Sequence, residues 1–189
     1  MDPSFGAGLA QAPEEPFTDV TSPGQWFYED VRNMYTDDYI TGFRDATFRP
    51  NVDVTREETV TFFGRVLDLD GTKRPVSFSD VEEGFYSSGY IASAVEEGII
   101  VGMTEERFAP KREIIRGDAA LILKRAFDIP DTDEEYFSDV EEEYYAGAVN
   151  AIASAGIAEG YPDGTFRQEQ SLTRAELVRI LSVAKNMNN

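Results

Sequence analysis

The sequence contains no cysteine and no histidine among its 189 residues. Without cysteine there is no disulfide framework, no thiolate metal site and no cysteine nucleophile. Without histidine there is no Ser-His-Asp catalysis and no zinc site built on imidazole. No apolar run approaches the roughly 18 residues that a membrane-spanning helix requires. The sequence therefore predicts no membrane insertion, no metal site and no catalytic residues of these kinds.

Basic residues are also scarce, because 17 lysines and arginines stand against 36 aspartates and glutamates, for a formal net charge of −19. A nucleic acid requires clustered basic side chains against its phosphates, so it is not an expected partner. The same argument disfavours an anionic membrane surface. Hydrophobic residues make up 41% of the chain and aromatic residues 12%, which is enough for a folded core.

A four-residue motif, Phe-Ser/Thr-Asp-Val, opens three related segments at 17–20, 78–81 and 137–140. Each copy is followed by an aromatic group and then by an apolar pattern at helical spacing. Further along come a glycine, a phenylalanine six residues later, and an arginine fourteen residues after the glycine. These spacings are the same in all three segments, so we interpret the segments as one repeated supersecondary unit. The three units are predicted to span 17–67, 78–127 and 137–186.

Each unit reads as a helix, a glycine-containing loop and a second helix. The predicted helices lie at 25–36, 54–67, 86–97, 114–127, 143–155 and 172–186. Two short helices cannot bury their own apolar faces, so we expect the three units to pack together around a pseudo-threefold axis. The predicted fold is all-α: one domain over 17–186, with a central helical bundle and a groove between neighbouring repeats.

Few residues lie outside the repeats. Residues 1–16 are predicted to be a disordered leader or tag remnant, and 187–189 a tail. Ala10-Gln11-Ala12 before Pro13 also resembles the small-residue end of a secretory signal. Because the sequence holds little besides the repeats, we expect it to be part of a larger protein.

The third repeat carries the clearest motifs, which are Phe137-Ser138-Asp139-Val140, Gly160-Tyr161-Pro162-Asp163-Gly164-Thr165-Phe166 and Thr173-Arg174-Ala175-Glu176. In this order they resemble the S-layer homology family, and the resemblance covers 17–186. It implies a pseudo-threefold helical domain that binds secondary cell wall polysaccharide, often through a pyruvate-ketal sugar. It also implies an extracellular location at the bacterial wall, S-layer proteins as further partners, and no cofactor.

The resemblance implies ligand-binding positions that recur once per repeat. The arginines are Arg56, Arg116 and Arg174, and each stands two residues before one of the acids Glu58, Asp118 and Glu176. The other positions are Gly42, Gly102 and Gly160, the aromatic Trp26, Tyr86 and Tyr144, and the aspartates Asp19, Asp80 and Asp139. A pyruvate ketal carries a carboxylate, which a planar guanidinium can bind through two donors. Each arginine also lies in a predicted first helical turn, where we expect free backbone N–H groups to favour an anion.

Structural roles are alternatives at several of these positions. The arginines fit a salt bridge or a cap as well as a ligand site, and the aspartates fit turn structure. The aromatic residues either stack on a sugar or seal the groove, whereas the glycines are expected to let the backbone approach the sugar. The repeated phenylalanines are predicted to be core residues: Phe17, Phe78, Phe137, Phe48, Phe108 and Phe166.

The second repeat departs furthest from the pattern. Ile115 replaces the capping threonine, Gly117 weakens the helix start, and Met103-Thr104-Glu105-Glu106 brings two carboxylates near the predicted anion site. The second repeat is therefore expected to supply the least reliable groove.

A wall-polysaccharide anchor is the favoured function. The alternative is a module that keeps the fold but binds a protein or assembles with itself. A glycosidase with paired carboxylates is disfavoured, because the acids repeat with the fold and no pair stands apart.

Overall fold

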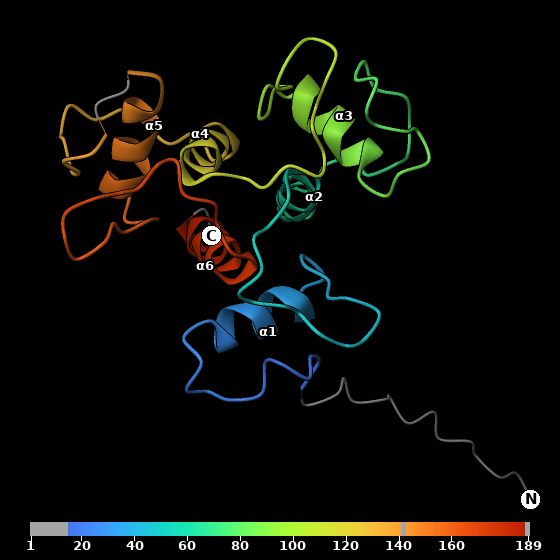
Figure 1. Cartoon of the computed structure of the whole chain (residues 1–189), viewed down its shortest axis with the longest axis horizontal. Helices are drawn as coiled ribbons and strands as arrows, with labels where there is room; N and C mark the ends of the chain where they lie inside the picture. Colours follow the sequence, from blue (N-terminus) through green and yellow to red (C-terminus); the bar gives the residue numbers. More distant parts are fainter. Residues whose placement is uncertain (1–14, 141–142, 188–189) are drawn as a thin grey trace, which may run out of the picture.

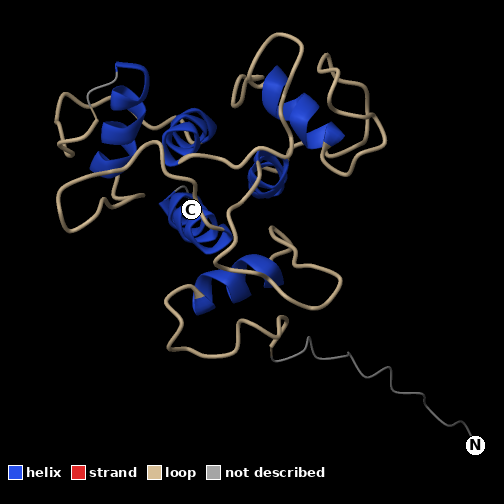
Figure 2. Cartoon of the chain, viewed as in Figure 1, coloured by secondary structure: helices blue, strands red, loops and turns tan. Residues whose placement is uncertain are grey.

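The computed structural model describes residues 15–140 and 143–187, and these form six helices. The helices are α1 (Tyr28–Thr36), α2 (Arg56–Val66), α3 (Ser88–Glu96), α4 (Arg116–Ala126), α5 (Glu143–Ser154) and α6 (Arg174–Met187). The described residues contain no strand, only isolated bridges (Figure 2). The all-α prediction is therefore confirmed. The signal-like segment at 10–12 lies outside the described residues.

The helices form an inner and an outer set around one centre (Figure 1). The inner helices are α2, α4 and α6, and the outer helices are α1, α3 and α5. Helix α3 packs on α2, α5 packs on α4, and α1 packs on α6. Each outer helix therefore rests on the inner helix of the preceding repeat, and the first repeat closes the ring onto the last. None of the six helices in the described part of the chain is long and apolar enough to cross a bilayer.

A triangle of backbone hydrogen bonds links the three repeats just before the inner helices. The N–H of Val54 donates to the carbonyl of Leu172 at 2.9 Å, Leu172 donates to Ile114 at 3.0 Å, and Ile114 donates to Val54 at 2.9 Å. All three side chains are fully buried. The inner helices are predicted to begin at 54, 114 and 172, but each begins two residues later. The reason is that the backbone groups of these residues bond between repeats instead of within a helix.

The first N–H groups of the inner helices also bond between repeats. Arg56 donates to the carbonyl of Arg112 at 2.8 Å, Arg116 to that of Gln170 at 2.9 Å, and Arg174 to that of Val52 at 2.9 Å. The next residue of each helix donates to a neighbouring carbonyl in the same way. The prediction of free N–H groups for an anion is therefore wrong at these positions, because carbonyls of the adjoining repeat already occupy them.

The phenylalanines of the repeats pack in pairs around the repeated glycines. The ring centroids are 5.4 Å apart for Phe17 and Phe48, and the second and third repeats repeat the arrangement at 5.6 and 5.2 Å. All six are buried except Phe137, which is half-buried against the core. A Cβ on Gly42 would lie 2.3 Å from the Phe17 ring, and Gly102 and Gly160 are equally crowded. These glycines therefore make room for a ring, a packing role that their recurrence in the motif does not reveal.

The repeated aspartates hold a strained loop in place. Asp19 accepts hydrogen bonds from the backbone N–H groups of Phe48 and Arg49, each at 2.7 Å, and Arg49 has a φ of 59°. Asp80 and Asp139 make the same pair of contacts in their own repeats. Burial acts to raise the pKa of Asp80, but these N–H donors outweigh it, so the pKa is lowered. The geometry supports the turn role over ligand contact.

In the first and third repeats, the loop after the repeated glycine holds an aspartate whose pKa predicts how stability depends on pH. The Thr165 hydroxyl donates to Asp163 at 2.6 Å and Arg167 pairs with it at 2.9 Å, which lowers the pKa of Asp163 to about 2. Asp45 stands in the same arrangement, and its pKa is also about 2. Because folding lowers the pKa of both aspartates, their ionised carboxylates stabilise the folded protein above the usual pKa of an aspartate. This stabilisation is lost as the pH falls from about 4 to about 2. A carboxyl-carbon NMR titration should give midpoints near 2, and Thr165→Val should move the Asp163 midpoint back up. A midpoint for Asp163 that Thr165→Val leaves unchanged would contradict the hydrogen-bond explanation.

Candidate ligand-binding grooves

The ring brings one arginine, one acid and one aromatic residue together between repeats. The Trp26 groove combines Trp26, Arg116 and Glu176. The Tyr144 groove combines Tyr144, Arg56 and Asp118. The Tyr86 groove combines Tyr86, Arg174 and Glu58, with Arg174 donating to Glu58 and interacting electrostatically with Tyr86. Each groove therefore draws its three predicted residues from three different repeats.

The arginines are buried, with exposed fractions of 3% for Arg56, 6% for Arg116 and 2% for Arg174. In each, Nε donates to the carbonyl of a core phenylalanine of the adjoining repeat, at 3.0, 2.7 and 2.8 Å respectively. Nη2 donates to a second carbonyl of the same loop, at 2.8, 3.3 and 2.9 Å. Burial lowers the pKa of all three groups, although an arginine stays charged throughout the ordinary pH range. Their first role is to tie each inner helix to the loop of the next repeat.

The remaining donors of the arginines distinguish the grooves. Nη1 of Arg174 donates to Glu58 at 2.6 Å, and Nη1 of Arg56 lies 3.8 Å from Asp118. Arg116 has no carboxylate within 4 Å among the residues that the structure describes. The arginine and the acid of the Trp26 groove thus interact electrostatically without a salt bridge, whereas those of the other two grooves lie within 4 Å of one another.

The acids also cap the helices on which they lie. The Glu58 and Glu176 side chains close capping boxes with Thr55 and Thr173. Asp118 instead accepts a hydrogen bond from the hydroxyl of Tyr145 at 3.0 Å. Gly117 faces that tyrosine, and a Cβ there would lie 2.8 Å from the ring. Of the departures of the second repeat, Gly117 therefore accommodates an aromatic side chain of the third.

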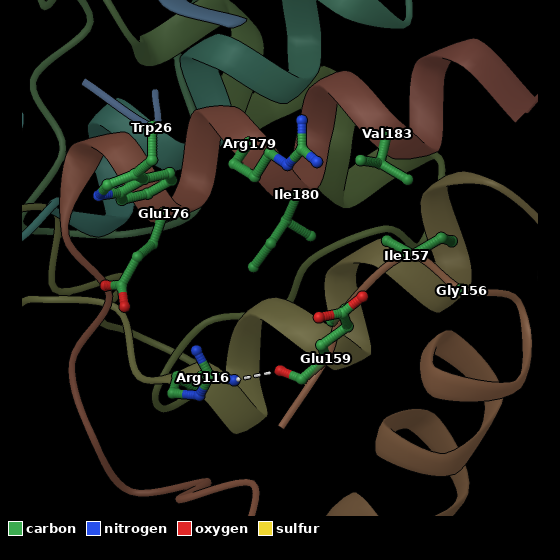
Figure 3. Close-up of a pocket in the computed structure, with 10 residues that line it drawn as sticks. Trp26, Arg116, Gly156, Ile157, Glu159, Glu176, Arg179, Ile180 and Val183 are labelled. Atoms are coloured by element: carbon green, nitrogen blue, oxygen red, sulfur yellow. Dashed lines mark hydrogen bonds between the residues drawn. The ribbon is translucent and has the colours of Figure 1, made fainter. Parts of the chain in front are cut away.

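The Trp26 groove encloses a cavity of about 210 Å³ (Figure 3). Trp26 is 59% exposed at one end. Ile180 and Val183 of α6 form an apolar wall, and Arg116 lies on the facing side, joined to the carbonyl of Glu159. An aromatic face, an apolar wall and opposed donors and acceptors are the groups that hold the ring and the polar substituents of a sugar.

The other two grooves differ from the Trp26 groove. The cavity of the Tyr144 groove measures about 30 Å³, and Tyr144 is 61% exposed beside it. In the Tyr86 groove the Tyr86 hydroxyl donates to Oε1 of Glu57 at 3.1 Å, and Lys111 binds the same oxygen. Burial and then the Glu57 charge raise the pKa of Tyr86, so it stays a neutral donor. Its hydroxyl is directed at protein and not at an incoming ligand.

The features for which the second repeat is expected to supply the least reliable groove are divided between two grooves. The structure places Arg116 against the loop of the third repeat, and the loop of the second repeat against Arg56. The repeat with the most altered sequence therefore supplies the arginine of the Trp26 groove, whose cavity is larger than that of the Tyr144 groove.

Several residues of the Trp26 groove were not predicted, chiefly Arg179, Ile180 and 156–159. Arg179 lies five residues after Arg174, where the other inner helices carry Thr61 and Leu121. Because Arg179 occurs in one repeat only, the repeated motif contains no signal for it. Within the described ranges, no three metal-ligating side chains cluster.

Comparison with known proteins identifies one family. A model of the S-layer homology domain matches residues 16–60, 77–120 and 136–178, which together make up more than half of the chain. The matched ranges begin within one residue of the three predicted repeats.

Three relatives show how such segments occur in longer proteins. The chain is 29% identical over 175 residues to an endoglucanase of Bacillus sp. (strain KSM-635), with 88% of this chain and 18% of the relative aligned. It is 23% identical to a cellulosome-anchoring protein of Acetivibrio thermocellus, over 76% of this chain and 34% of the relative. It is 32% identical to a surface-layer 125 kDa protein of Lysinibacillus sphaericus, over 79% and 12%. The chain thus spans about a third or less of these relatives.

Proposed function

Since the chain belongs to the S-layer homology domain family, we propose that it binds secondary cell wall polysaccharide in the Trp26 groove and so attaches a larger protein to the bacterial wall. Members of this family are cell-wall anchoring modules, and the chain is a cell-surface, wall-attached protein. The two relatives named for anchoring and for the surface layer support the role of attachment.

One observation carries the choice of groove: Arg116 and Glu176 face the same cavity without pairing. Arg116 has an unused N–H donor, which can bind an acceptor on a ligand. Glu176 has a carboxylate oxygen outside its capping box, which can accept a hydrogen bond from a ligand. Glu176 uses Oε2 for Thr173 and makes no hydrogen bond through Oε1 within the described residues. A sugar that carries an acidic substituent beside free hydroxyl groups supplies both partners.

A pyruvate ketal fits this pattern as the acidic substituent. Its carboxylate offers two oxygens to Arg116, and the hydroxyl groups of the same ring offer donors to Glu176. The face of the sugar then lies against Trp26 and the apolar wall of α6. The global charge of −19 does not prevent this contact, because screening limits long-range repulsion to about 8 Å at physiological ionic strength.

The single tryptophan of the chain makes this groove directly observable, because Trp26 is the only one. Titration with a pyruvylated wall-polysaccharide fragment is expected to change the tryptophan emission, and the same fragment without its ketal is expected to bind at least about tenfold more weakly. By calorimetry, Trp26→Ala should weaken binding about tenfold without loss of folding, because the side chain is mostly exposed.

Tyr144→Ala is the matched control, since it removes an equally exposed aromatic residue from a groove whose arginine and acid lie together. It should leave the affinity of the fragment within about twofold of the wild-type value. Equal loss in both variants would place binding in more than one groove. Absence of heat and of emission change from a folded protein would rule out glycan binding and favour the protein-interaction or self-assembly module.

A further inference from the structure

Arg179 is a second guanidinium in the wall of the Trp26 groove, across the cavity from Arg116 (Figure 3). It lies on α6, where the equivalent positions of α2 and α4 hold Thr61 and Leu121. Of the three grooves, this one alone carries an arginine at that position. It is therefore a feature of this groove and not of the repeat.

One ion pair holds Arg179. Its Nη1 donates to Oδ2 of Asp30 on α1 at 3.0 Å, and the two side chains are 57% and 12% exposed. Asp30 is also outside the repeat pattern, because the matching positions of α3 and α5 hold Tyr90 and Ala148. Both members of the pair thus occur only where the first repeat closes onto the third.

The two arginines of the groove differ in how firmly they are held. Arg116 is buried and tied to two backbone carbonyls, so it cannot move without disturbing the adjoining loop. Arg179 is largely exposed and, within the described residues, makes a single ion-paired contact, to the mostly buried Asp30. An incoming carboxylate can replace Asp30 on Arg179 where its own contacts offset the cost of leaving the Asp30 carboxylate without its partner.

The charges around the cavity also favour such an exchange. Glu159 and Glu176 line it together with the two arginines. While Asp30 neutralises Arg179, one guanidinium faces two carboxylates, which disfavours an anionic ligand. Once Arg179 turns from Asp30 to the ligand, two guanidinium groups face the ligand together with these two carboxylates.

We propose that Arg179 is a second, movable ligand for the acidic sugar of the Trp26 groove, and that Asp30 occupies it while the groove is empty. This rests on the proposed function. The carboxylate of the sugar binds between Arg179 and Arg116, and a hydroxyl group donates to Glu176. Asp30 is then an internal competitor of the ligand, and the affinity of the groove depends on the exchange.

Opposite effects of two substitutions test this. Calorimetry with the pyruvylated fragment is expected to show about tenfold weaker binding for Arg179→Gln and about threefold tighter binding for Asp30→Asn. Asp37→Asn is the matched control, because Asp37, the residue that follows α1, also pairs with α6, through Lys185 at 3.2 Å, and lies outside this cavity. It changes the net charge equally and should alter the affinity by less than about twofold.

A plain brace between α1 and α6 gives a different result. Both substitutions would then weaken binding, or neither would change it, and either outcome overturns the proposal. In the double variant, Asp30→Asn should have no effect once Arg179 is glutamine. If the wild-type protein itself binds no fragment, the proposed function fails first. Wild-type binding that depends on Trp26 but not on Arg179 refutes the exchange alone.

Discussion

Arg174→Ala is expected to destabilise the protein by about 3–5 kcal/mol, which is a large part of the stability of a domain of this size. Arg174 is 2% exposed and donates to the carbonyls of Phe48 and Thr41 and to the carboxylate of Glu58. Its removal leaves two carbonyls and a carboxylate without their partner and opens a cavity where the third repeat meets the first. Chemical denaturation followed by circular dichroism measures the change.

Arg107→Ala is the control for the loss of an arginine as such. Arg107 is 69% exposed, and its nearest carboxylate, on Asp80, is 3.7 Å away, so its loss should cost less than about 1 kcal/mol. Arg174→Lys should recover little of the stability, because an ammonium group cannot reach two carbonyls and a carboxylate in the planar geometry of a guanidinium. A stable, fully folded Arg174→Ala variant would contradict the bracing role.

The same bracing affects how binding experiments are designed. Replacement of Arg56, Arg116 or Arg174 by alanine removes a tie between repeats as well as a donor to the groove. A loss of glycan binding in such a variant can therefore follow from a distorted ring. Trp26 and Arg179 are better probes, because both are exposed at the cavity and neither joins an inner helix to a loop backbone.

The repeated features were predictable from the sequence because they follow from local physics. Capping residues and apolar periodicity located all six helices, and the core phenylalanines were identified by their recurrence. The glycine spacing aligned Trp26, Tyr86 and Tyr144, and all three side chains are exposed. Trp26 and Tyr144 line cavities, and Tyr86 donates a hydrogen bond to Glu57. These features can be predicted without knowing which repeats are in contact.

The features that depend on the closed ring were not predictable. The partners of the helix-start N–H groups come from another repeat, so the free N–H groups expected there do not exist. The pairing of Arg174 with Glu58 spans 116 residues, and Arg116 faces Glu176 without pairing. Nearly identical local sequences therefore give unequal grooves, because each groove is assembled from three copies that have diverged separately.

Gly160→Ala and Gly147→Ala are expected to change stability in opposite directions although the chemical change is the same. A Cβ on Gly160 would lie 2.3 Å from the Phe137 ring and 2.6 Å from the carbonyl oxygen of Thr165, so both the ring and the backbone must move, at a cost of about 3 kcal/mol. A Cβ on Gly147 meets nothing within 4 Å. Because that glycine lies within α5, alanine should stabilise the helix by about 1 kcal/mol.

Thermal unfolding distinguishes the two roles available to the repeated glycine. For a chain of this length, each kcal/mol shifts Tm by about 2–4 °C, so Gly160→Ala should lower Tm by about 6–12 °C and Gly147→Ala should raise it by about 2–4 °C. Sugar approach alone would instead leave the Tm of Gly160→Ala unchanged and weaken only glycan binding. The crowding by Phe137 requires the loss of stability to appear without any ligand, and an unchanged Tm would return Gly160 to the ligand-binding role that the motif suggests.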